Sequence, residues 1–254
     1  MHTPAFLDGF QAIAHRGGAD DPENPAAENS LAAFQRAYDL GFRYFETDVH
    51  VTKDGVPVIF HDALLGRVTD AVGAVFDHPL EQLRQIQLRG GGTIPTVAEL
   101  LDAFPDVSFN IDIKADGAAA PLAHAIDACN AQRRVLVTSF SVTRLNAFRK
   151  VADPSIALGA PRKVVAAWVA HANLGWPKPQ YPAVALQVPV RSGPIPVIRR
   201  HFIKIAHRNG LKVHVWTIDD AAQMEELIDK GVDGIMTDQP AVLKDVLHQR
   251  GMWK

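Results

Sequence analysis

Residues 42–62 read FRYFETDVHVTKDGVPVIFHD, which is two apolar runs joined by a short polar turn. The first run, residues 42–49, has the β-branched and aromatic content of a buried strand. The second run, residues 56–60, also predicts a strand, but the turn Lys53-Asp54-Gly55 is too short for a parallel crossover, which takes about a dozen residues. Because Asp-Gly favours a tight hairpin, we expect the first strand to run past the edge of its sheet and fold back, which returns His61 to that edge.

Apolar runs of the same kind recur along the chain and alternate with amphipathic stretches. Eight predicted strands, with a plausible helix between most of them, in a chain of 254 residues predict an α/β fold, a (β/α)8 TIM barrel. An open doubly wound sheet is the alternative, and the eightfold count favours closure. The predicted strands are residues 10–14, 42–49, 107–113, 135–138, 156–159, 184–187, 213–216 and 234–237, and the predicted helices are residues 31–40, 96–104, 121–130, 141–151, 195–209, 219–230 and 240–249.

Two segments interrupt the alternation. Residues 63–95 contain no clean strand–helix unit, so we expect a small insertion after the hairpin, sited over the barrel mouth, within a single domain spanning residues 1–254. Residues 174–196 are rich in proline and include Trp176, which predicts an irregular loop.

The composition excludes some classes of protein. Hydrophobic residues make up 47% of the chain and its formal net charge is −2, so we expect a globular protein with no nucleic-acid or anionic-membrane partner. The single cysteine, Cys129, permits no internal disulfide. With no signal-peptide pattern and no apolar run of spanning length, we expect a soluble, cytoplasmic protein without stable membrane insertion. Nothing in the sequence indicates an oligomeric state.

Polar residues cluster where the predicted strands end. Active sites of TIM barrels lie at the C-terminal ends of the strands, and ionisable groups at several strand ends are hard to explain as packing. We therefore expect these residues to converge on one site. They are His15 and Arg16 after the first strand, Glu46 and Asp48 in the second, Asp112 and Lys114 in the third, and Gln187, Trp216 and Asp238 in later ones.

Three carboxylates dominate this set. Glu46 and Asp48 point to the same face because strand side chains alternate, and Asp112 joins them from a neighbouring strand. Oxygen ligands of this kind suit a hard divalent ion, Mg²⁺ or Ca²⁺, and without a cation the three charges would repel one another. The alternative is that one of them pairs with Arg43 or Lys53 on the surface; the flanking histidines favour the metal.

The remaining residues suggest roles in acid–base chemistry and substrate binding. His15 and His61 titrate near neutral pH and are candidates for general base and general acid. Arg16 and Lys114 could hold a phosphate group. Gln187 and Trp216 are assigned to substrate binding, the indole as an apolar wall for the alcohol, although a core position suits Trp216 equally. His214 shares the face of Trp216 and could line the barrel interior.

Taken in order, these motifs resemble the glycerophosphodiester phosphodiesterase family over nearly the whole chain. Each motif is weak alone, and the ordered set is specific. The motifs are His15-Arg16-Gly17, Glu28-Asn29-Ser30 with Ala33-Phe34, Glu46-x-Asp48-Val49, Thr52-Lys53-Asp54-Gly55-x-Pro57-Val58, His61-Asp62, Asn110-Ile111-Asp112-Ile113-Lys114, Val215-Trp216-Thr217-Ile218 and Gly231-Val232-Asp233-Gly234-Ile235-x-Thr237-Asp238.

The resemblance implies a TIM barrel with an insertion after the hairpin and a divalent ion on Glu46, Asp48 and Asp112. It implies a His15–His61 acid–base pair, Arg16 and Lys114 on the phosphate, and Glu28 with Asn29 supporting the site at its edge. The chain departs from the family pattern at Asp112, where Glu is more usual. A second pair, Glu23-Asn24, precedes Glu28; we assign Glu28 because Leu31 and Phe34 continue the expected helix.

The sequence thus predicts a metal-dependent hydrolase that converts a glycerophosphodiester to glycerol 3-phosphate and an alcohol, with His15 as base and His61 as acid. Water or a neighbouring substrate hydroxyl could be the nucleophile. The alternative is a phospholipase D-like or lysophospholipid phosphodiesterase on the same fold. That enzyme needs an apolar surface at the mouth, for which residues 174–196 are the candidate. A silent binding protein would lack a key group, and none is missing.

Overall fold

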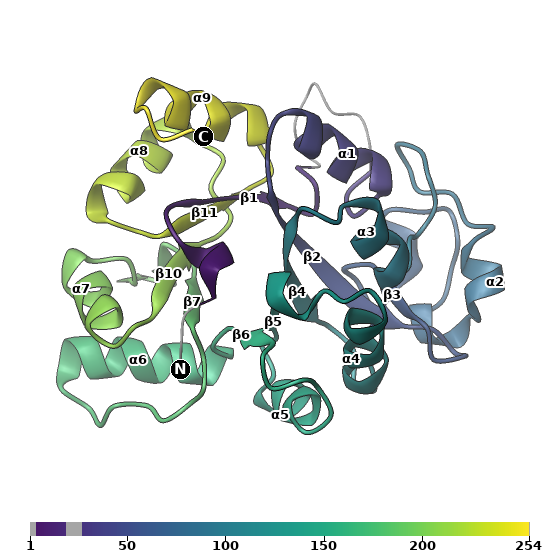
Figure 1. Cartoon of the computed structure of the whole chain (residues 1–254), viewed down its shortest axis with the longest axis horizontal. Helices are drawn as coiled ribbons and strands as arrows, with labels where there is room; N and C mark the ends of the chain where they lie inside the picture. The colour runs from purple at the N-terminus through teal and green to yellow at the C-terminus, as the bar shows by residue number, and fades with distance from the viewer. Residues whose placement is uncertain (1–3, 19–26, 254) are drawn as a thin grey trace.

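Eight parallel strands form the centre of the computed structural model, which describes residues 4–18 and 27–253 (Figure 1). Their order is β6-β5-β4-β2-β1-β11-β10-β7, and a parallel bridge between Gly159 and Ala185 joins the two ends. The sheet therefore nearly closes, and the predicted TIM barrel is confirmed. The strands are β1 Gln11–His15, β2 Tyr44–Val51, β4 Ser108–Ile113, β5 Val135–Thr138, β6 Ala157–Leu158, β7 Ala185–Val188, β10 Lys212–Val215 and β11 Gly234–Thr237.

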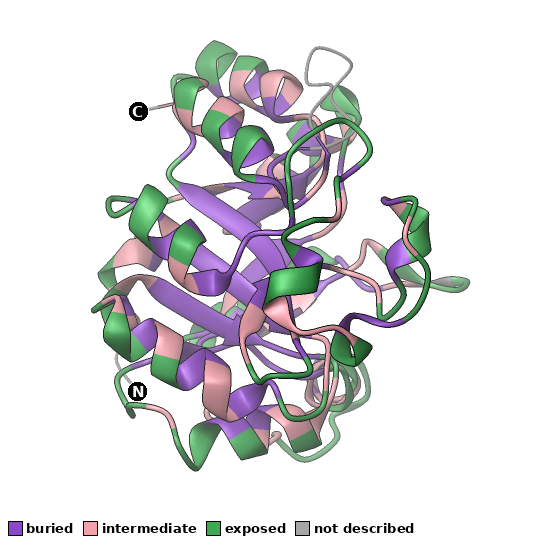
Figure 2. Ribbon diagram, turned by 90° about the vertical axis from the view of Figure 1, so that its right-hand side faces the viewer, coloured by how far each residue is buried: buried purple, intermediate pink, exposed green. Residues whose placement is uncertain are grey.

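Helices surround the strands and bury one face each, so purple strands lie inside helices with green outer faces in Figure 2. Local signals fix several helix starts: Ser30 accepts a hydrogen bond from the Ala33 amide, and Thr96 and Glu99 form a capping box. The helices are α1 Leu31–Asp39, α2 Leu80–Leu83, α3 Val97–Ala103, α4 Ala119–Ala128, α5 Val142–Arg149, α6 Arg162–Leu174, α7 Arg200–Arg208, α8 Ala221–Lys230 and α9 Pro240–Gln249.

The β-hairpin is present as predicted. β3, Pro57–Ile59, pairs antiparallel with β2, with Val49 opposite Ile59. Gly55 takes the positive φ of +84° that the turn requires. After β3, the Phe60 amide donates to the Asp48 carbonyl over 3.0 Å, so the chain returns to the barrel edge with His61 next.

The segment after the hairpin has a small core of its own. Two 3₁₀ turns, Leu65–Arg67 and Val75–Asp77, precede α2, and their apolar side chains pack with those of the hairpin. Buried Leu65, Val75 and Leu83 hold this segment against Val58 and Phe60. Its polar side chains are thereby fixed beside the barrel edge.

The structure differs from the sequence-based expectation between residues 162 and 209. The helix α6 occupies a run that was not predicted to be helical, and it ends at Gly175 with φ +67°. The helix α7 starts at Arg200 rather than residue 195 because a short hairpin, β8 Arg191–Ser192 and β9 Ile195–Pro196, takes the residues before it. This hairpin and α6 form one wall of the pocket described below.

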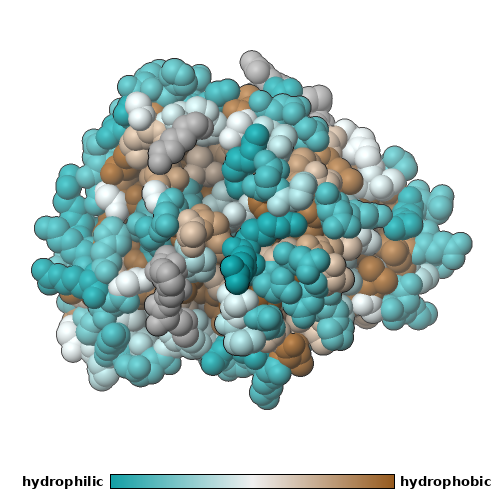
Figure 3. Space-filling model, in the orientation of Figure 1, coloured by the Kyte–Doolittle hydropathy of each residue, from teal (hydrophilic) through white to brown (hydrophobic). Residues whose placement is uncertain are grey.

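The inner and outer faces of the strands bury different cores. Outward side chains such as Phe45, Phe109 and Val137 pack beneath the helices. Inward side chains such as Ile13 and Leu136 pack with Leu7 of the 3₁₀ turn Ala5–Leu7. Figure 3 shows mostly hydrophilic side chains over the outer face in that view, with hydrophobic ones between them. In the described part of the chain, no helix is both long enough and apolar enough to cross a membrane.

Candidate active site

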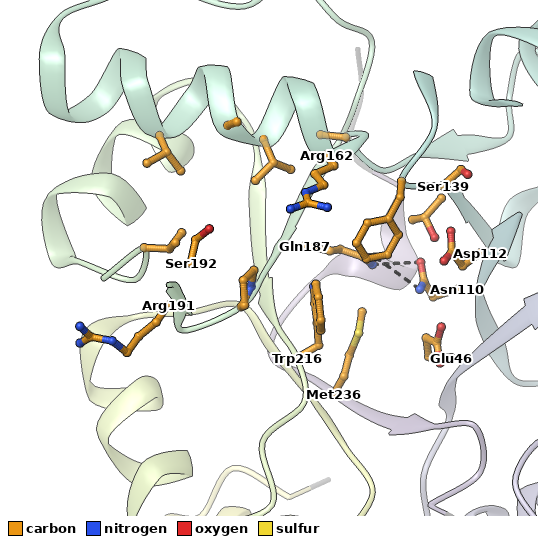
Figure 4. Close-up of a pocket in the computed structure, with 18 of the residues that line it drawn as sticks. Glu46, Asn110, Asp112, Ser139, Arg162, Gln187, Arg191, Ser192, Trp216 and Met236 are labelled. Carbon is orange, nitrogen blue, oxygen red and sulfur yellow. Dashed lines mark hydrogen bonds between the residues drawn. The ribbon is translucent and has the colours of Figure 1, made fainter. Parts of the chain in front are cut away.

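A pocket of about 750 Å³ opens at the C-terminal ends of the strands and continues along α6 (Figure 4). Its lining contains every residue that the sequence analysis assigned to catalysis, metal or substrate. They are His15, Arg16, Glu46, Asp48, His61, Asp112, Lys114, Gln187 and Trp216. Glu28 and Asn29 lie behind this set, and Glu23 and Asn24 are outside the described residues.

Strand register brings the charged groups together. Asp48 of β2 lies opposite Asp112 of β4, and His15 of β1 lies opposite Glu46. In a parallel sheet, register partners point to the same face, so all four side chains enter the barrel mouth. Glu46, Asp48 and Asp112 are each at most 5% exposed.

The loop after β1 is shaped by unusual backbone angles. Arg16, Gly17 and Gly18 have φ values of 51°, 86° and 78°. A Cβ on Gly17 would lie 2.7 Å from the Ala33 Cβ, so the loop packs directly on α1. The positive φ of Arg16, uncommon outside glycine, turns its guanidinium toward the carboxylates of the site.

Both histidines are held by a carboxylate at the same ring nitrogen. His15 Nδ1 lies 2.7 Å from Asp238 Oδ1, and His61 Nδ1 lies 2.6 Å from Asp62 Oδ1. A carboxylate at Nδ1 favours the proton there and leaves Nε2 to face the pocket. Burial lowers the pKa of His15, but the charges of Glu46 and Asp238 outweigh it, so the net pKa is raised.

Two cations of the chain lie against the carboxylates. Lys114 Nζ is 3.0 Å from Asp48 Oδ1 and 2.7 Å from Asp112 Oδ2, and Arg16 Nε is 3.2 Å from Asp48 Oδ2. Burial raises the pKa of Asp48, but Lys114 and Arg16 more than compensate, so Asp48 stays ionised with a lowered pKa.

The other two carboxylates are less well neutralised. Burial and the charge of Asp48 raise the pKa of Glu46 to about 7. Burial also raises the pKa of Asp112, and the nearby Lys114 compensates only in part. Glu46 Oε2 and Asp112 Oδ1 are buried and accept no hydrogen bond. The trio therefore has free oxygen ligands and a deficit of positive charge.

As it stands, the trio is not a preformed metal site. Among the residues that the structure describes, no three carboxylate, imidazole or thiol groups meet closely enough to hold an ion. The ammonium of Lys114 lies between Asp48 and Asp112 instead. The carboxylate oxygens are the donors that a hard cation prefers. Their present spacing is the one at which Asp48 and Asp112 both pair with the Lys114 ammonium. The alternative that one carboxylate of the trio pairs with Arg43 on the surface is wrong, because Arg43 pairs with Asp106.

Supporting residues link the site to the insertion. Asn29 donates from Nδ2 to Asp48 Oδ2 over 3.1 Å and accepts from the Thr47 hydroxyl over 2.7 Å. Arg67, from the 3₁₀ turn after the hairpin, donates to both carboxylate oxygens of Glu28 and also to Asp62. The insertion thus fixes the carboxylate that holds His61.

The opposite side of the pocket is mostly apolar. Gln187 Nε2 donates to Asn110 Oδ1 over 2.9 Å, and the Trp216 ring meets Phe140 edge-on at 5.8 Å. From there the pocket runs between α6 and the β8–β9 hairpin, as Arg162 at one end and Ser192 at the other show in Figure 4. The apolar side chains of this groove are Val165, Ala166, Val169, Ala170, Leu174, Pro189 and Val197.

Sequence reasoning gave no role to four polar groups of the site, although Asp238 was already placed among the residues at the strand ends. Asp238 and Asp62 follow directly on motifs that were noticed, so a search for a carboxylate partner of each histidine could have found them. Asn110 faces inward by the same alternation as Asp112. Arg67 carries no sequence signal because the insertion has no periodic pattern.

Comparisons with known proteins agree with this geometry. The chain matches the model of the Glycerophosphoryl diester phosphodiesterase family over residues 15–242. It is 40% identical to the Mycobacterium tuberculosis protein named "Probable glycerophosphodiester phosphodiesterase 2", over 99% of this chain and 96% of that protein. It is 32% identical to the Caldanaerobacter subterraneus protein named "Glycerophosphodiester phosphodiesterase", over 94% of this chain and 98% of that protein.

A solved structure supports the fold. The chain superposes with a TM-score of 0.76 on an Oleispira antarctica phosphodiesterase in complex with the product sn-glycerol-3-phosphate. The alignment covers 97% of this chain and 100% of that one, at 24% identity. At that identity the superposition bears on the architecture alone, which is again the TIM barrel.

Proposed function

Because the chain belongs to the glycerophosphoryl diester phosphodiesterase family, and so to the phosphoric diester hydrolases, we propose that the pocket at the barrel mouth cleaves glycerophosphodiesters to glycerol 3-phosphate and an alcohol. One observation carries the proposal: two histidines, each held at Nδ1 by its own carboxylate, line the same pocket as the cations Arg16 and Lys114. The product bound by the Oleispira antarctica phosphodiesterase, sn-glycerol-3-phosphate, is of the same kind as the product proposed here.

The chain's own residues supply both proton transfers. We assign His15 as the base: its Nε2 takes the proton of the nucleophile, either water or the neighbouring glycerol hydroxyl, whose oxygen attacks phosphorus. Attack by water gives glycerol 3-phosphate directly, whereas attack by the hydroxyl gives a cyclic glycerol phosphate that water opens in a second step. We assign His61 as the acid: its Nε2 proton goes to the leaving alcohol oxygen as the P–O bond breaks. Arg16 and Lys114 stabilise the negative charge that builds on the phosphoryl oxygens.

Leaving-group chemistry tests this order. On glycerophosphocholine, His15→Ala and His61→Ala should each lose about a thousandfold in kcat. On a diester with a p-nitrophenol leaving group, which departs without a proton, His61→Ala should recover most of its activity and His15→Ala should not. Recovery of His15→Ala alone would reverse the two roles, and near-wild-type rates for both variants on glycerophosphocholine would remove the acid–base pair from the mechanism.

We further propose that Glu46, Asp48 and Asp112 hold a divalent ion, Mg²⁺ or Ca²⁺. The support is the pair of buried carboxylate oxygens without hydrogen bonds and the raised pKa values of Glu46 and Asp112. When bound, such an ion would polarise a phosphoryl oxygen as a Lewis acid. The side chain of Asp112 is one methylene shorter than the Glu of the family pattern, and it is paired with Lys114. The position of Asp112 relative to Glu46 and Asp48 therefore depends both on its length and on this pairing.

Metal binding can be measured without turnover. Protein treated with EDTA should bind Mg²⁺ or Ca²⁺ in a calorimetric titration and regain activity when the ion is returned. Asp112→Asn should lose the binding heat, whereas Asp116→Asn, which alters an exposed carboxylate four residues away, should keep it. Activity that is indifferent to EDTA, together with no binding heat for the wild type, would contradict the metal proposal.

The groove along α6 favours a second candidate substrate, a lysophospholipid. It extends the pocket by the length of a helix of 13 residues, about 20 Å, and its wall is formed by Val and Ala side chains. Hydrolysis of glycerophosphocholine and of lysophosphatidylcholine should be compared in the wild type and in Ala170→Phe, which narrows the groove. A selective loss on the lysophospholipid supports this substrate, and equal rates in both proteins exclude the groove from substrate binding.

A further inference from the structure

The charges of this chain are strongly segregated along the sequence. Residues 154–218 contain nine of the 26 lysines and arginines and none of the 28 acidic residues. The net charge of −2 therefore averages a cationic part and an acidic remainder. The expectation that the chain has no electrostatic attraction to an anionic surface rests on this average and does not consider the regional distribution of charge.

The fold gathers several of these cations around the outer end of α6. Arg191 and Arg199 line the groove together with Leu174, and Figure 4 shows Arg191 on the hairpin across from the helix. His201 Nε2 lies 2.9 Å from the Ala172 carbonyl, which places its neighbour Arg200 at the same end.

The cations at this end are not neutralised by an acidic side chain in the described part of the chain, and Arg191 donates to the Pro194 carbonyl over 2.6 Å. Lys178 lies in the loop that follows α6, with Nζ 6.0 Å from the centre of the Trp168 ring on that helix. Arg191, Arg199, Arg200 and Lys178 are exposed, and none has a carboxylate within ion-pair distance among residues 4–18 and 27–253. Elsewhere cations are commonly paired, as Arg84 is with Glu99.

Two large apolar side chains project among these cations. Leu174 is 69% exposed and Trp176 is 60% exposed, on either side of Gly175. The loop that carries them is fixed, since His171 Nδ1 lies 2.6 Å from the Trp176 carbonyl. Tryptophan and leucine framed by lysine and arginine are typical of a surface that lies in the headgroup region of a membrane.

The insertion also exposes apolar side chains, but its charges differ from those at the outer end of α6. Phe76 in the insertion is 60% exposed, as Trp176 is, and Val72 is 84% exposed. Yet residues 63–95 contain as many acidic residues as arginines, and Arg89 is paired with Asp70. This segment therefore offers no net positive charge to an anionic surface, whereas the outer end of α6 does.

We propose that the outer end of α6, formed by Leu174, Trp176, Lys178, Arg191, Arg199 and Arg200, docks reversibly on an anionic lipid surface. Trp176 and Leu174 enter the headgroup region, and the four cations lie against lipid phosphates. The groove of the pocket ends at Leu174, so docking would open it directly to the lipid layer. The proposal does not depend on the proposed catalytic chemistry, because docking needs no turnover.

Vesicle co-sedimentation tests this without substrate. The wild type should bind vesicles of phosphatidylcholine mixed with phosphatidylglycerol, bind pure phosphatidylcholine weakly, and release as salt is raised. Each cation near the surface contributes about fivefold in affinity, so the double variant Lys178→Glu/Arg200→Glu should lose at least 25-fold, about fivefold for each residue. The matched reversal Arg133→Glu/Lys150→Glu, on exposed cations outside the segment, should keep its binding.

The apolar contribution has its own matched pair. Trp176→Ala should weaken vesicle binding about tenfold, and Phe76→Ala should leave it unchanged. All four variants should hydrolyse glycerophosphocholine at the wild-type rate, which shows that they are folded. Equal binding to both vesicle types, or equal losses in the two double variants, would overturn the proposal. So would salt-sensitive binding of a DNA oligonucleotide tighter than vesicle binding and unaffected by Trp176→Ala, which would assign the cations to a polynucleotide.

Discussion

The two ends of the barrel interior treat the same residue type in opposite ways. At the closed end, His214 is fully buried against the edge of Tyr44, neither ring nitrogen has a hydrogen-bond partner, and burial lowers its pKa to about 4. At the open end, His15 is also largely buried, yet its pKa is raised because Glu46 and Asp238 outweigh the burial.

The same contrast runs along single strands. On β2, Tyr44 and Glu46 both point into the barrel and are two residues apart. Tyr44 packs in the apolar core inside the barrel, and Glu46 lines the pocket. On β10, His214 packs inside the barrel, and Trp216 just beyond the strand lines the pocket. The difference teaches that this barrel makes a reactive site by grouping carboxylates around its histidines, because burial alone only keeps a histidine neutral.

Removing the central carboxylate should have the largest effect. Asp48 pairs with both Arg16 and Lys114, so Asp48→Asn leaves two largely buried cations without that partner. We expect the free energy of unfolding to fall by about 3 kcal/mol and activity to be lost. Urea denaturation at neutral pH measures the first, with Asp116→Asn as the surface control; an unchanged midpoint would mean that the open end does not depend on this pairing.

At the closed end, acid should destabilise the protein through His214. Its pKa falls from 6.5 to about 4 on folding, so the unfolded chain binds the additional proton between these values, and stability decreases as the pH falls through that window. The loss amounts to about 3 kcal/mol by pH 4.

His214→Phe should remove this pH dependence while keeping the edge contact with Tyr44. Thermal unfolding of both proteins between pH 7 and about pH 4 gives the comparison. Parallel curves for the wild type and the variant would show that His214 is not neutral in the folded state.

Asp238→Asn should make His15, at the open end, more like His214 at the closed end, because it removes one of the charges beside the imidazole. It keeps a hydrogen-bonding group at His15 Nδ1 but removes the charge and permits the wrong tautomer. We expect kcat on glycerophosphocholine to fall about a hundredfold with the melting temperature nearly unchanged. A fall in stability without a change in kcat would make Asp238 structural only.

The smallest effect should come from the insertion. Arg67 is partly exposed and ties Glu28 and Asp62 together, so Arg67→Ala should lower kcat/KM about fivefold, in keeping with the modest strength of such ion pairs. Arg89→Ala, which breaks a pair in the same segment away from the site, is the control. Equal effects of the two would mean that the insertion acts through its overall packing.

Much of the open end could be predicted from sequence because it depends on short-range rules. Strand alternation placed Glu46 and Asp48 on one face, and the Asp54-Gly55 turn returned His61 to them. The partner of His15 could not be found that way, since Asp238 lies 223 residues away and meets it only when β11 pairs with β1.

The α6 side of the pocket was harder to predict. The helix α6 follows Pro161 and has apolar side chains on the groove side as well as the core side. Its sequence therefore shows little of the alternation between apolar and polar faces that predicts a helix. The hairpin residues Arg191 and Ser192 carry no clear strand signal. The segregation of charge was readable in the sequence, but the net charge concealed it.

Release of glycerol 3-phosphate from glycerophosphocholine by the wild type and by the double variant His15→Ala/His61→Ala tests the central claim most directly. The claim predicts rapid release by the wild type and almost none by the double variant, whose circular dichroism and melting temperature should match those of the wild type. Release by the double variant at a rate near that of the wild type would contradict it, because the carboxylate-held histidines at the open end of the barrel would then not carry the reaction.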